Sequence, residues 1–428
     1  MLKGVPISWG GLVAVCRAQL YKDEFLRQST MMFLASLIGC ICSYLYQIYV
    51  ARALGPAGYG AFGSLFAIFY LISIFSGTVQ AGAARFVSRL NATGDDERIG
   101  SFLYGLMRKS ILLGAAGFVL FCLISSGIAS FLQMASTMDV VVLGTVILLS
   151  FIQPAASGVL QGLQQFGLLA FTSVLSTGLK LAFGVILVAL GYGVAGALGA
   201  VTLSALVVVL FVLFSLRSYL GSSKKNGYDF RELYIYSAPT LLVMLCLAVP
   251  SNVDVIMAKH FFSSHEAGLY TAASVVGKMV LFLPGAIASV MFPKASEMKT
   301  LKMSTWSLLN RSLLLTGLLS GGAAVAFVLF PGLMAMIFGE VYRQAGEVQA
   351  FYALMMALFA LTWVVAQYCL ATGDMKYVYL LGGFSGAEIM MVSAYHATIV
   401  QMAQLLAAAN LILFLASYVY VFRRRKSC

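Results

Sequence analysis

The feature that most constrains this chain is a series of twelve apolar runs, each of roughly 20 residues. That is the length an α-helix needs to cross the hydrocarbon core of a bilayer. A soluble fold could not bury so much apolar surface, because 61% of the residues are hydrophobic and only 10% are charged. The sequence therefore predicts an all-α polytopic membrane protein with about 12 transmembrane helices. The runs cover residues 29–51, 61–81, 110–131, 139–160, 168–190, 194–216, 233–257, 268–292, 312–338, 347–371, 377–398 and 400–421.

The Lys and Arg residues are distributed unevenly between the loops. If the spans are followed in order, 22 of the 27 fall on one side of the membrane. Loops rich in Lys and Arg normally stay in the cytoplasm. We therefore expect a multi-pass protein of the cell (cytoplasmic or inner) membrane with both termini in the cytoplasm. The net charge of +12 follows from this bias and needs no nucleic-acid partner. The exceptions are Arg52, Lys259 and Arg343 on the outer side, and Lys180 and Lys278 within spans.

A polar break near mid-chain divides the spans six and six. It reads "GSSKKNGYDFRE" and is typical of a linker. We predict five parts: a cytoplasmic N-terminal segment (1–28), a six-helix bundle (29–220), a cytoplasmic linker (221–232), a second six-helix bundle (233–422) and a basic C-terminal tail (423–428).

The two halves also show a weak internal repeat. A shift of 210 residues places Gly58 on Gly268, and Arg52 and Lys259 both follow the outer end of the first span of their half. Because each half has six spans, both halves begin on the same side of the membrane. Such a parallel repeat has its axis along the membrane normal. We therefore expect two parallel-related six-helix bundles around a central cleft, an architecture typical of transporters.

Three stretches carry a resemblance to a known family. They read "YVARALGPAGYGAFGSLFAIFYLISIFSG", "SNVDVIMAKHFFSSHEAGLYTAASVVGKMVLFLPGAIASVMFPKASEM" and "VLQGLQQFG". They resemble the polysaccharide-flippase branch of the multidrug/oligosaccharidyl-lipid/polysaccharide exporter superfamily, over essentially the whole chain. The resemblance implies movement of a polyprenyl-linked oligosaccharide to the outer leaflet by alternating access, for cell-surface polysaccharide biosynthesis. A polysaccharide polymerase or glycosyltransferases of the same pathway would then be partners. Cation-coupled multidrug efflux antiporters share the two six-span halves and are the alternative.

Charged residues inside spans are the best evidence for a site, because each is costly in hydrocarbon and usually faces a cavity or a partner. Lys180 shares a helical face with serine and threonine residues, and Lys278 follows Ser274 by four residues. Both lysines suit an anionic diphosphate. Asp254 and Glu388 are candidates for coupling to H⁺ or Na⁺. The alternative is that these lysines and acids only neutralise one another between helices.

Four further basic residues are candidates for contact with a substrate. Arg85 and Arg89 lie one turn apart at the inner end of the second span, where a cytoplasmic substrate would enter. Ordinary retention of positive charge in the cytoplasm explains them equally well. Arg52 and Lys259 would form a cationic rim that meets a pyrophosphate group on the outer side. For Arg52 the other explanation is extension of its charged end toward the membrane surface.

Several other functions find no support in the sequence. No GxxxxGK[ST] motif is present, and the three histidines lack the spacing of zinc ligands. The predicted outer loops are too short to hold the carboxylates and arginines of a sugar polymerase. We therefore expect neither an enzyme nor a cofactor.

Overall fold

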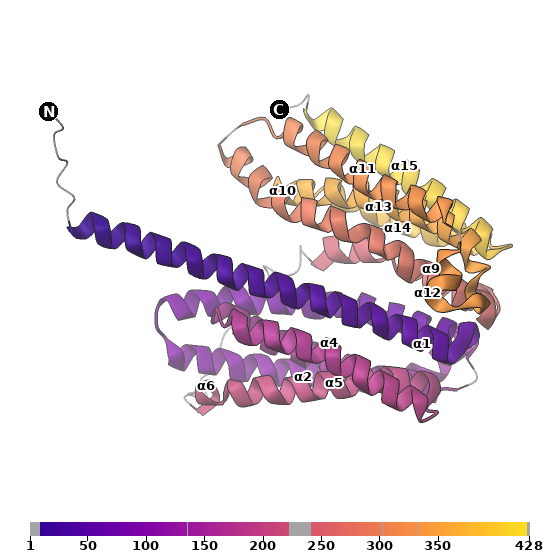
Figure 1. The fold of residues 1–428 in the computed structure, drawn as a ribbon, viewed down its shortest axis with the longest axis horizontal. Coiled ribbons are helices and arrows are strands. Elements are labelled where there is room, and N and C mark those ends of the chain that lie inside the picture. Colours follow the sequence, from indigo (N-terminus) through magenta and orange to yellow (C-terminus); the bar gives the residue numbers. More distant parts are fainter. Residues whose placement is uncertain (1–8, 135, 222–240, 302, 331, 426–428) are drawn as a thin grey trace.

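The computed structural model describes residues 9–134, 136–221, 241–301, 303–330 and 332–425, and these are almost entirely helical (Figure 1). The first half contains α1 (Trp9–Ala92), α2 (Asp96–Phe131), α3 (Met138–Gly162), α4 (Phe166–Ala189), α5 (Gly193–Ser215) and α6 (Arg217–Gly221). The second half begins with a helical segment, Leu241–Ala248, which is followed by α8 (Val253–Phe261), α9 (Ser264–Gly277), η1 (Lys278–Leu281), α10 (Phe282–Thr300), α11 (Trp306–Leu329), α12 (Leu333–Phe338), η2 (Glu340–Tyr342), α13 (Ala345–Ala371), α14 (Tyr377–Ala394) and α15 (Ile399–Arg425).

These helices match the predicted spans. Ten helices of the described ranges are long and apolar enough to cross a membrane, and the bent pair Leu241–Ala248 and Val253–Phe261 forms an eleventh span. The first of the ten, α1, is two helical arms joined at Gly55, where φ is 67° and ψ is 176°. A side chain disfavours that backbone conformation, so glycine is the natural residue at this bend. Counting both arms gives twelve spans, and the prediction of an all-α polytopic membrane protein is confirmed.

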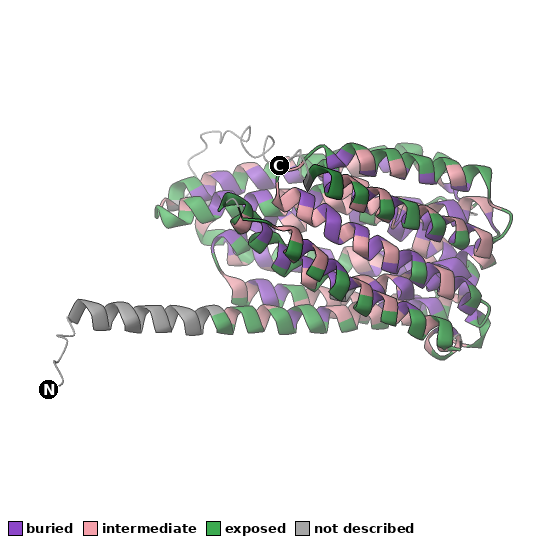
Figure 2. Cartoon of the chain, turned by 90° about the horizontal axis from the view of Figure 1, so that it is seen from above, coloured by how far each residue is buried: buried purple, intermediate pink, exposed green. Residues whose placement is uncertain are grey.

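The outer surface of the bundles is apolar. Exposed residues cover the outward faces of the helices in Figure 2, and many of them are large hydrophobic residues such as Leu123, Leu210 and Leu318. An apolar patch of this extent would aggregate in water, whereas hydrocarbon accommodates it. This surface is the one expected to face lipid.

The two halves form separate bundles that touch at one end (Figure 1). In the first half α3 packs between α1, α2 and α5, and in the second half α13 packs against α9, α10, α11 and α15. The halves meet chiefly where α1 bends and contacts α8, α9 and α12. We call this the joined end. The predicted linker 221–232 lies outside the described residues except for Gly221, as do residues 1–8 and 426–428, so the predicted part boundaries stay predictions.

Glycines allow the helices of the two halves to approach closely at the joined end. A Cβ added to Gly60 would lie 2.8 Å from the backbone nitrogen of Gly268, and one added to Gly268 would lie 1.8 Å from Pro56 O. The second arm of α1 therefore packs on α9 backbone against backbone, as small residues permit in membranes. These two helices are the ones that the 210-residue shift aligns, so counterpart helices meet across the interface, as a two-fold relation between the halves requires.

Candidate functional site

A cavity of about 510 Å³ lies between the two halves. It starts beside the joined end at Gly63 and Thr271 and extends along α1 and α9 to Ser36 and Leu281. Its wall on α1 comes from one helical face, because the lining residues 36, 39, 40, 43, 44 and 47 recur every three or four positions. Both halves contribute residues to it. A ligand in this cavity would contact the two bundles at once.

Lys180 lines this cavity from α4, in the first half. Its Nζ donates a hydrogen bond to Ser43 Oγ at 3.1 Å and lies 5.2 Å from the centroid of the Tyr46 ring. The ring face attracts the ammonium group by a cation–π interaction. Tyr46 is itself fixed, because its hydroxyl donates to Ala197 O at 2.7 Å. The protein thus holds the lysine in place with neutral groups.

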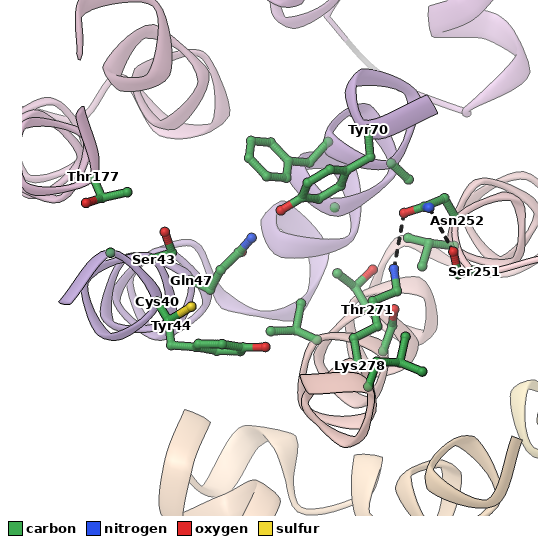
Figure 3. Close-up of a pocket in the computed structure, with 18 of the residues that line it drawn as sticks. Cys40, Ser43, Tyr44, Gln47, Tyr70, Thr177, Ser251, Asn252, Thr271 and Lys278 are labelled. Carbon is green, nitrogen blue, oxygen red and sulfur yellow. Dashed lines mark hydrogen bonds between the residues drawn. The ribbon is translucent and has the colours of Figure 1, made fainter. Parts of the chain in front are cut away.

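Lys278 lines the same cavity from the second half. It is the first residue of η1, the short 3₁₀ segment between α9 and α10. Its Nζ donates to Asn252 Oδ1 at 3.3 Å (Figure 3). Asn252 in turn donates to Ala248 O at 2.9 Å. The break in the helix therefore coincides with the charged residue, as is common at the binding sites of transporters.

No carboxylate forms an ion pair with either lysine among the described residues. Ion pairs identified there include Arg98–Asp95, Arg343–Glu340 and Arg424–Asp374. Asp254 is close enough to Lys278 for their charges to interact. Both lysines thus line the cavity between the halves, and their role in binding a substrate stays a prediction.

Sequence reasoning found serine and threonine residues beside the two lysines but missed the uncharged polar residues that α1 contributes to the cavity. Tyr44 and Gln47 come from the first arm of α1 and Tyr70 from the second arm, and they face the space beside Lys278 in Figure 3. Aromatic rings and amides of this kind recognise uncharged polar ligands such as sugars. The shared face of Tyr44 and Gln47 on the first arm could have been found from the three-and-four spacing, but the spacing alone does not show which face meets the other half.

Asp254 and Glu388 lie together in the second half, away from the main cavity. Asp254 is 3% exposed and accepts hydrogen bonds from Tyr352 Oη at 2.8 Å and Tyr270 Oη at 3.2 Å. Glu388 is 9% exposed and accepts from Asn410 Nδ2 at 3.3 Å. Both acids line a small cavity of about 10 Å³. The two candidate acids are thus brought together, with three hydrogen-bond donors that the sequence did not reveal.

Two oxygens near these acids have no hydrogen-bond partner. They are Asp254 Oδ1 and Asn410 Oδ1, both fully buried. A buried polar atom without a partner costs on the order of 1–3 kcal/mol. A proton or a small monovalent cation bound at either oxygen would offset this cost there.

Arg52 is exposed and Lys259 is buried, and both contact groups of the opposite half. Arg52 donates from Nε to Ile337 O and from Nη2 to Met336 O, both at 2.9 Å. Lys259 is 1% exposed and donates to Ser264 Oγ at 2.9 Å and to Gln133 O at 3.4 Å. Each is therefore committed to protein groups at the joined end. Lys259 is thus buried by the α2–α3 connection and Ser264, and the predicted contact of Arg52 and Lys259 with a pyrophosphate group stays a prediction.

Arg85 and Arg89 lie on the second arm of α1, at the end of the molecule away from the joined end, and both are exposed. The guanidinium group of Arg89 lies 5.6 Å from the centroid of the Phe86 ring. Neither arginine lines the cavity between the halves. Their predicted contact with an entering substrate stays a prediction.

The chain belongs to a known family. Residues 25–299 match the family model described as "Polysaccharide biosynthesis protein". The chain is also 24% identical over 309 residues to the "Putative O-antigen transporter" of Shigella flexneri, covering 69% of this chain and 72% of that protein.

Solved structures show the same fold. An inward-facing multidrug resistance MATE family transporter of the MOP superfamily superposes with a TM-score of 0.77 at 16% identity, covering 91% of this chain and 95% of that one. The lipid II flippase MurJ in an inward closed conformation superposes with a TM-score of 0.71 at 14% identity, covering 92% and 87%. The resemblance is confirmed at the level of the family, because the chain belongs to the polysaccharide-biosynthesis family and has the fold of these two solved structures.

Proposed function

We propose that this protein flips a polyprenyl-diphosphate-linked oligosaccharide from the cytoplasmic to the outer leaflet by alternating access, for cell-surface polysaccharide biosynthesis. The observation that carries the proposal is the pair of lysines, Lys180 and Lys278, which face one cavity from opposite halves. A diphosphate bears at least one negative charge per phosphate, and moving it out of water is costly unless fixed cations replace the water. Lys180 and Lys278 provide two such cations.

The cavity wall also fits the uncharged part of such a substrate. Tyr44, Gln47 and Tyr70 offer aromatic faces, hydroxyls and an amide beside Lys278 (Figure 3). The similarity to an O-antigen transporter and to a lipid II flippase supports a lipid-linked sugar as the cargo. In this proposal the termini are cytoplasmic, so the joined end faces outward and the cavity faces the leaflet where the substrate is made.

We further propose that Asp254 and Glu388 couple transport to H⁺ or Na⁺. The unpartnered oxygens of Asp254 and Asn410 support this assignment. A connection to the substrate cavity also exists, because Tyr352 Oη bonds both Asp254 and Ser274, and Ser274 lines the main cavity. Binding of a cation would neutralise the charge that attracts Lys278 and leave the lysine available to the substrate.

The second candidate function is cation-coupled multidrug efflux. The MATE fold and the buried acids favour it. The two candidates predict opposite roles for the lysines, because a cationic drug would be repelled by them, whereas an anionic diphosphate requires them.

The test uses protein reconstituted in vesicles with a polyprenyl-diphosphate sugar on one leaflet. We expect Lys278→Met and Lys180→Met each to lower the flipping rate by about 10- to 100-fold, as loss of a charged contact worth roughly 1.5–3 kcal/mol implies. Methionine keeps length and apolar bulk while removing the charge. Lys294→Met is the matched control, because Lys294 is exposed on α10 and does not line the cavity.

Unchanged flipping by the Lys180→Met, Lys278→Met double variant would refute the proposal. Faster export of a cationic dye by that variant, without any flipping by the wild-type protein, would establish the efflux alternative.

A further inference from the structure

The joined end is held by polar contacts as well as by glycine packing. The six hydrogen bonds identified between described residues of the two halves all lie there. They fall into two groups. One group surrounds Arg52 of the first half, and the other surrounds Lys259 of the second half.

The first group ties the bend of α1 to the connection between α11 and α13. Arg52 donates two hydrogen bonds to carbonyls of α12, and Tyr342 Oη donates back to Ala51 O at 2.8 Å. The carbonyls of the last turn of a helix have no partner within the helix, and a cation near that end also interacts favourably with the helix dipole. The guanidinium group is thus a cap that comes from the opposite half.

The second group ties the end of α8 to the connection between α2 and α3. Lys259 Nζ lies 3.4 Å from Gln133 O, and Gln133 Nε2 donates to His260 O at 2.8 Å. His260 Nδ1 lies 2.6 Å from Phe131 O, and its ring stacks on that of Phe131. Gln133 has φ of 49°, a left-handed conformation that is unfavourable for a residue with a side chain. Glycine would relieve that strain but would lose the bond to His260.

The two groups are counterparts under the internal repeat. Arg52 and Lys259 each follow the first span of their half, and each donates to the connection between the third and fourth spans of the other half. The return bonds match as well, because Tyr342 and Gln133, from those connections, donate to Ala51 O and His260 O. Ala51 directly precedes Arg52 in the chain, and His260 directly follows Lys259. Chance contacts would not be expected to repeat in this way.

We propose that Arg52 and Lys259 are paired latches that keep the joined end closed while the cavity is open at the other end. Alternating access requires the halves to separate at the joined end, so all six bonds must break in that step. Bonds from charged donors are stronger than neutral ones, and water can replace them once the interface opens. The latches therefore set the ratio of the two conformations and leave the substrate cavity unchanged. The inference relies on alternating access, which is part of the proposed function, but not on the identity of the substrate.

The test measures distances between spin labels in the full-length protein, with its native cysteines replaced and no substrate added. One pair, Met138→Cys and Val341→Cys, reports on the joined end, and a second pair, Phe171→Cys and Leu301→Cys, reports on the opposite end. All four residues are exposed. We expect Arg52→Met and Lys259→Met each to raise the ratio of separated to closed joined ends by about tenfold, which corresponds to about 1.4 kcal/mol. The second pair should move closer in the same molecules.

Arg343→Met is the matched control, because Arg343 is a cation at the joined end whose ion pair is with Glu340 of its own half. Arg52→Lys, which keeps the charge but loses the two-pronged geometry, should give an intermediate shift. Distances in Arg52→Met and Lys259→Met that equal those of Arg343→Met would overturn the proposal. Broader distance distributions for both label pairs would also overturn it, since they would show that Arg52 and Lys259 support folding. If the distances shift in the variants but the wild-type protein flips no lipid-linked sugar, the latches are supported and the proposed function is rejected.

Discussion

Replacement of Gly268 by alanine should prevent the two halves from meeting as they do here. The added Cβ would lie 1.8 Å from Pro56 O and 2.4 Å from Pro56 C. Real Cβ atoms essentially never approach another heavy atom closer than 3.0 Å, so α1 and α9 would have to separate by about 1.2 Å. Both obstructing atoms belong to the backbone, and no change of rotamer can relieve the clash. We expect a cost of about 3 kcal/mol, the upper part of the range for overpacking.

The measurement is the thermal unfolding midpoint of purified Gly268→Ala protein in detergent, together with the distance between the labels at the joined end. The midpoint should fall and the distance should increase. Gly321→Ala is the control, because no atom lies within 4 Å of a Cβ at that position in α11. It should leave stability unchanged or raise it by up to about 1 kcal/mol through helix propensity. Equal unfolding midpoints for wild type and Gly268→Ala would refute the steric argument.

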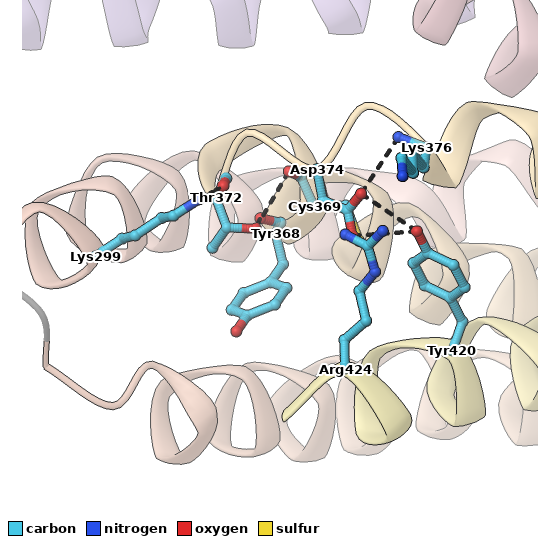
Figure 4. Close-up of polar contacts among 8 residues, drawn as sticks. All are labelled: Lys299, Tyr368, Cys369, Thr372, Asp374, Lys376, Tyr420 and Arg424. Carbon is cyan, nitrogen blue, oxygen red and sulfur yellow. Dashed lines mark hydrogen bonds and ion pairs between the residues drawn. The ribbon is translucent and has the colours of Figure 1, made fainter. Parts of the chain in front are cut away.

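Two more predictions concern the second half. Glu388→Gln keeps the shape of the side chain but removes its charge. Transport should then continue down a substrate gradient and lose its dependence on an H⁺ or Na⁺ gradient. Persistence of that dependence would exclude Glu388 as a coupling residue. Asp374→Asn should lower the free energy of unfolding by about 1 kcal/mol, because Asp374 accepts from Tyr420 Oη and pairs with Arg424, which ties the α13–α14 turn to α15 (Figure 4). Glu340→Gln is the control, because both members of the Glu340–Arg343 pair are exposed, and it should change the free energy of unfolding little. Equal losses of stability in the two variants would contradict the role assigned to Asp374.

The sequence by itself determined the class of protein and the number of spans. Apolar runs of about 20 residues have one stable arrangement in a bilayer, because a helix satisfies its own backbone hydrogen bonds. The prediction of spans therefore needed no knowledge of tertiary contacts, and within the described residues all twelve correspond to helical segments. The family resemblance was also present in the sequence, and the family match agrees with it.

The candidate site could be predicted only in part. The four charged residues within spans could be identified because a charged side chain in hydrocarbon is costly and is usually kept for a function. They are Lys180, Lys278, Asp254 and Glu388. Their grouping into a pair of cavity lysines and a separate pair of acids was not, since the members of each pair are over 90 residues apart in the chain. Asn410 and Tyr352 were missed because uncharged polar residues are common in transmembrane helices and carry no comparable signal.

The roles of Arg52 and Lys259 were decided by tertiary structure alone. Their chain positions identify them as outer cations and as counterparts in the repeat, but chain position does not show what lies opposite. The acceptors, Met336 O, Ile337 O and Gln133 O, are backbone carbonyls of the other half. Every residue type carries such a carbonyl, so no sequence pattern marks it as an acceptor. Only the packing of one half on the other selects which carbonyls a cation reaches.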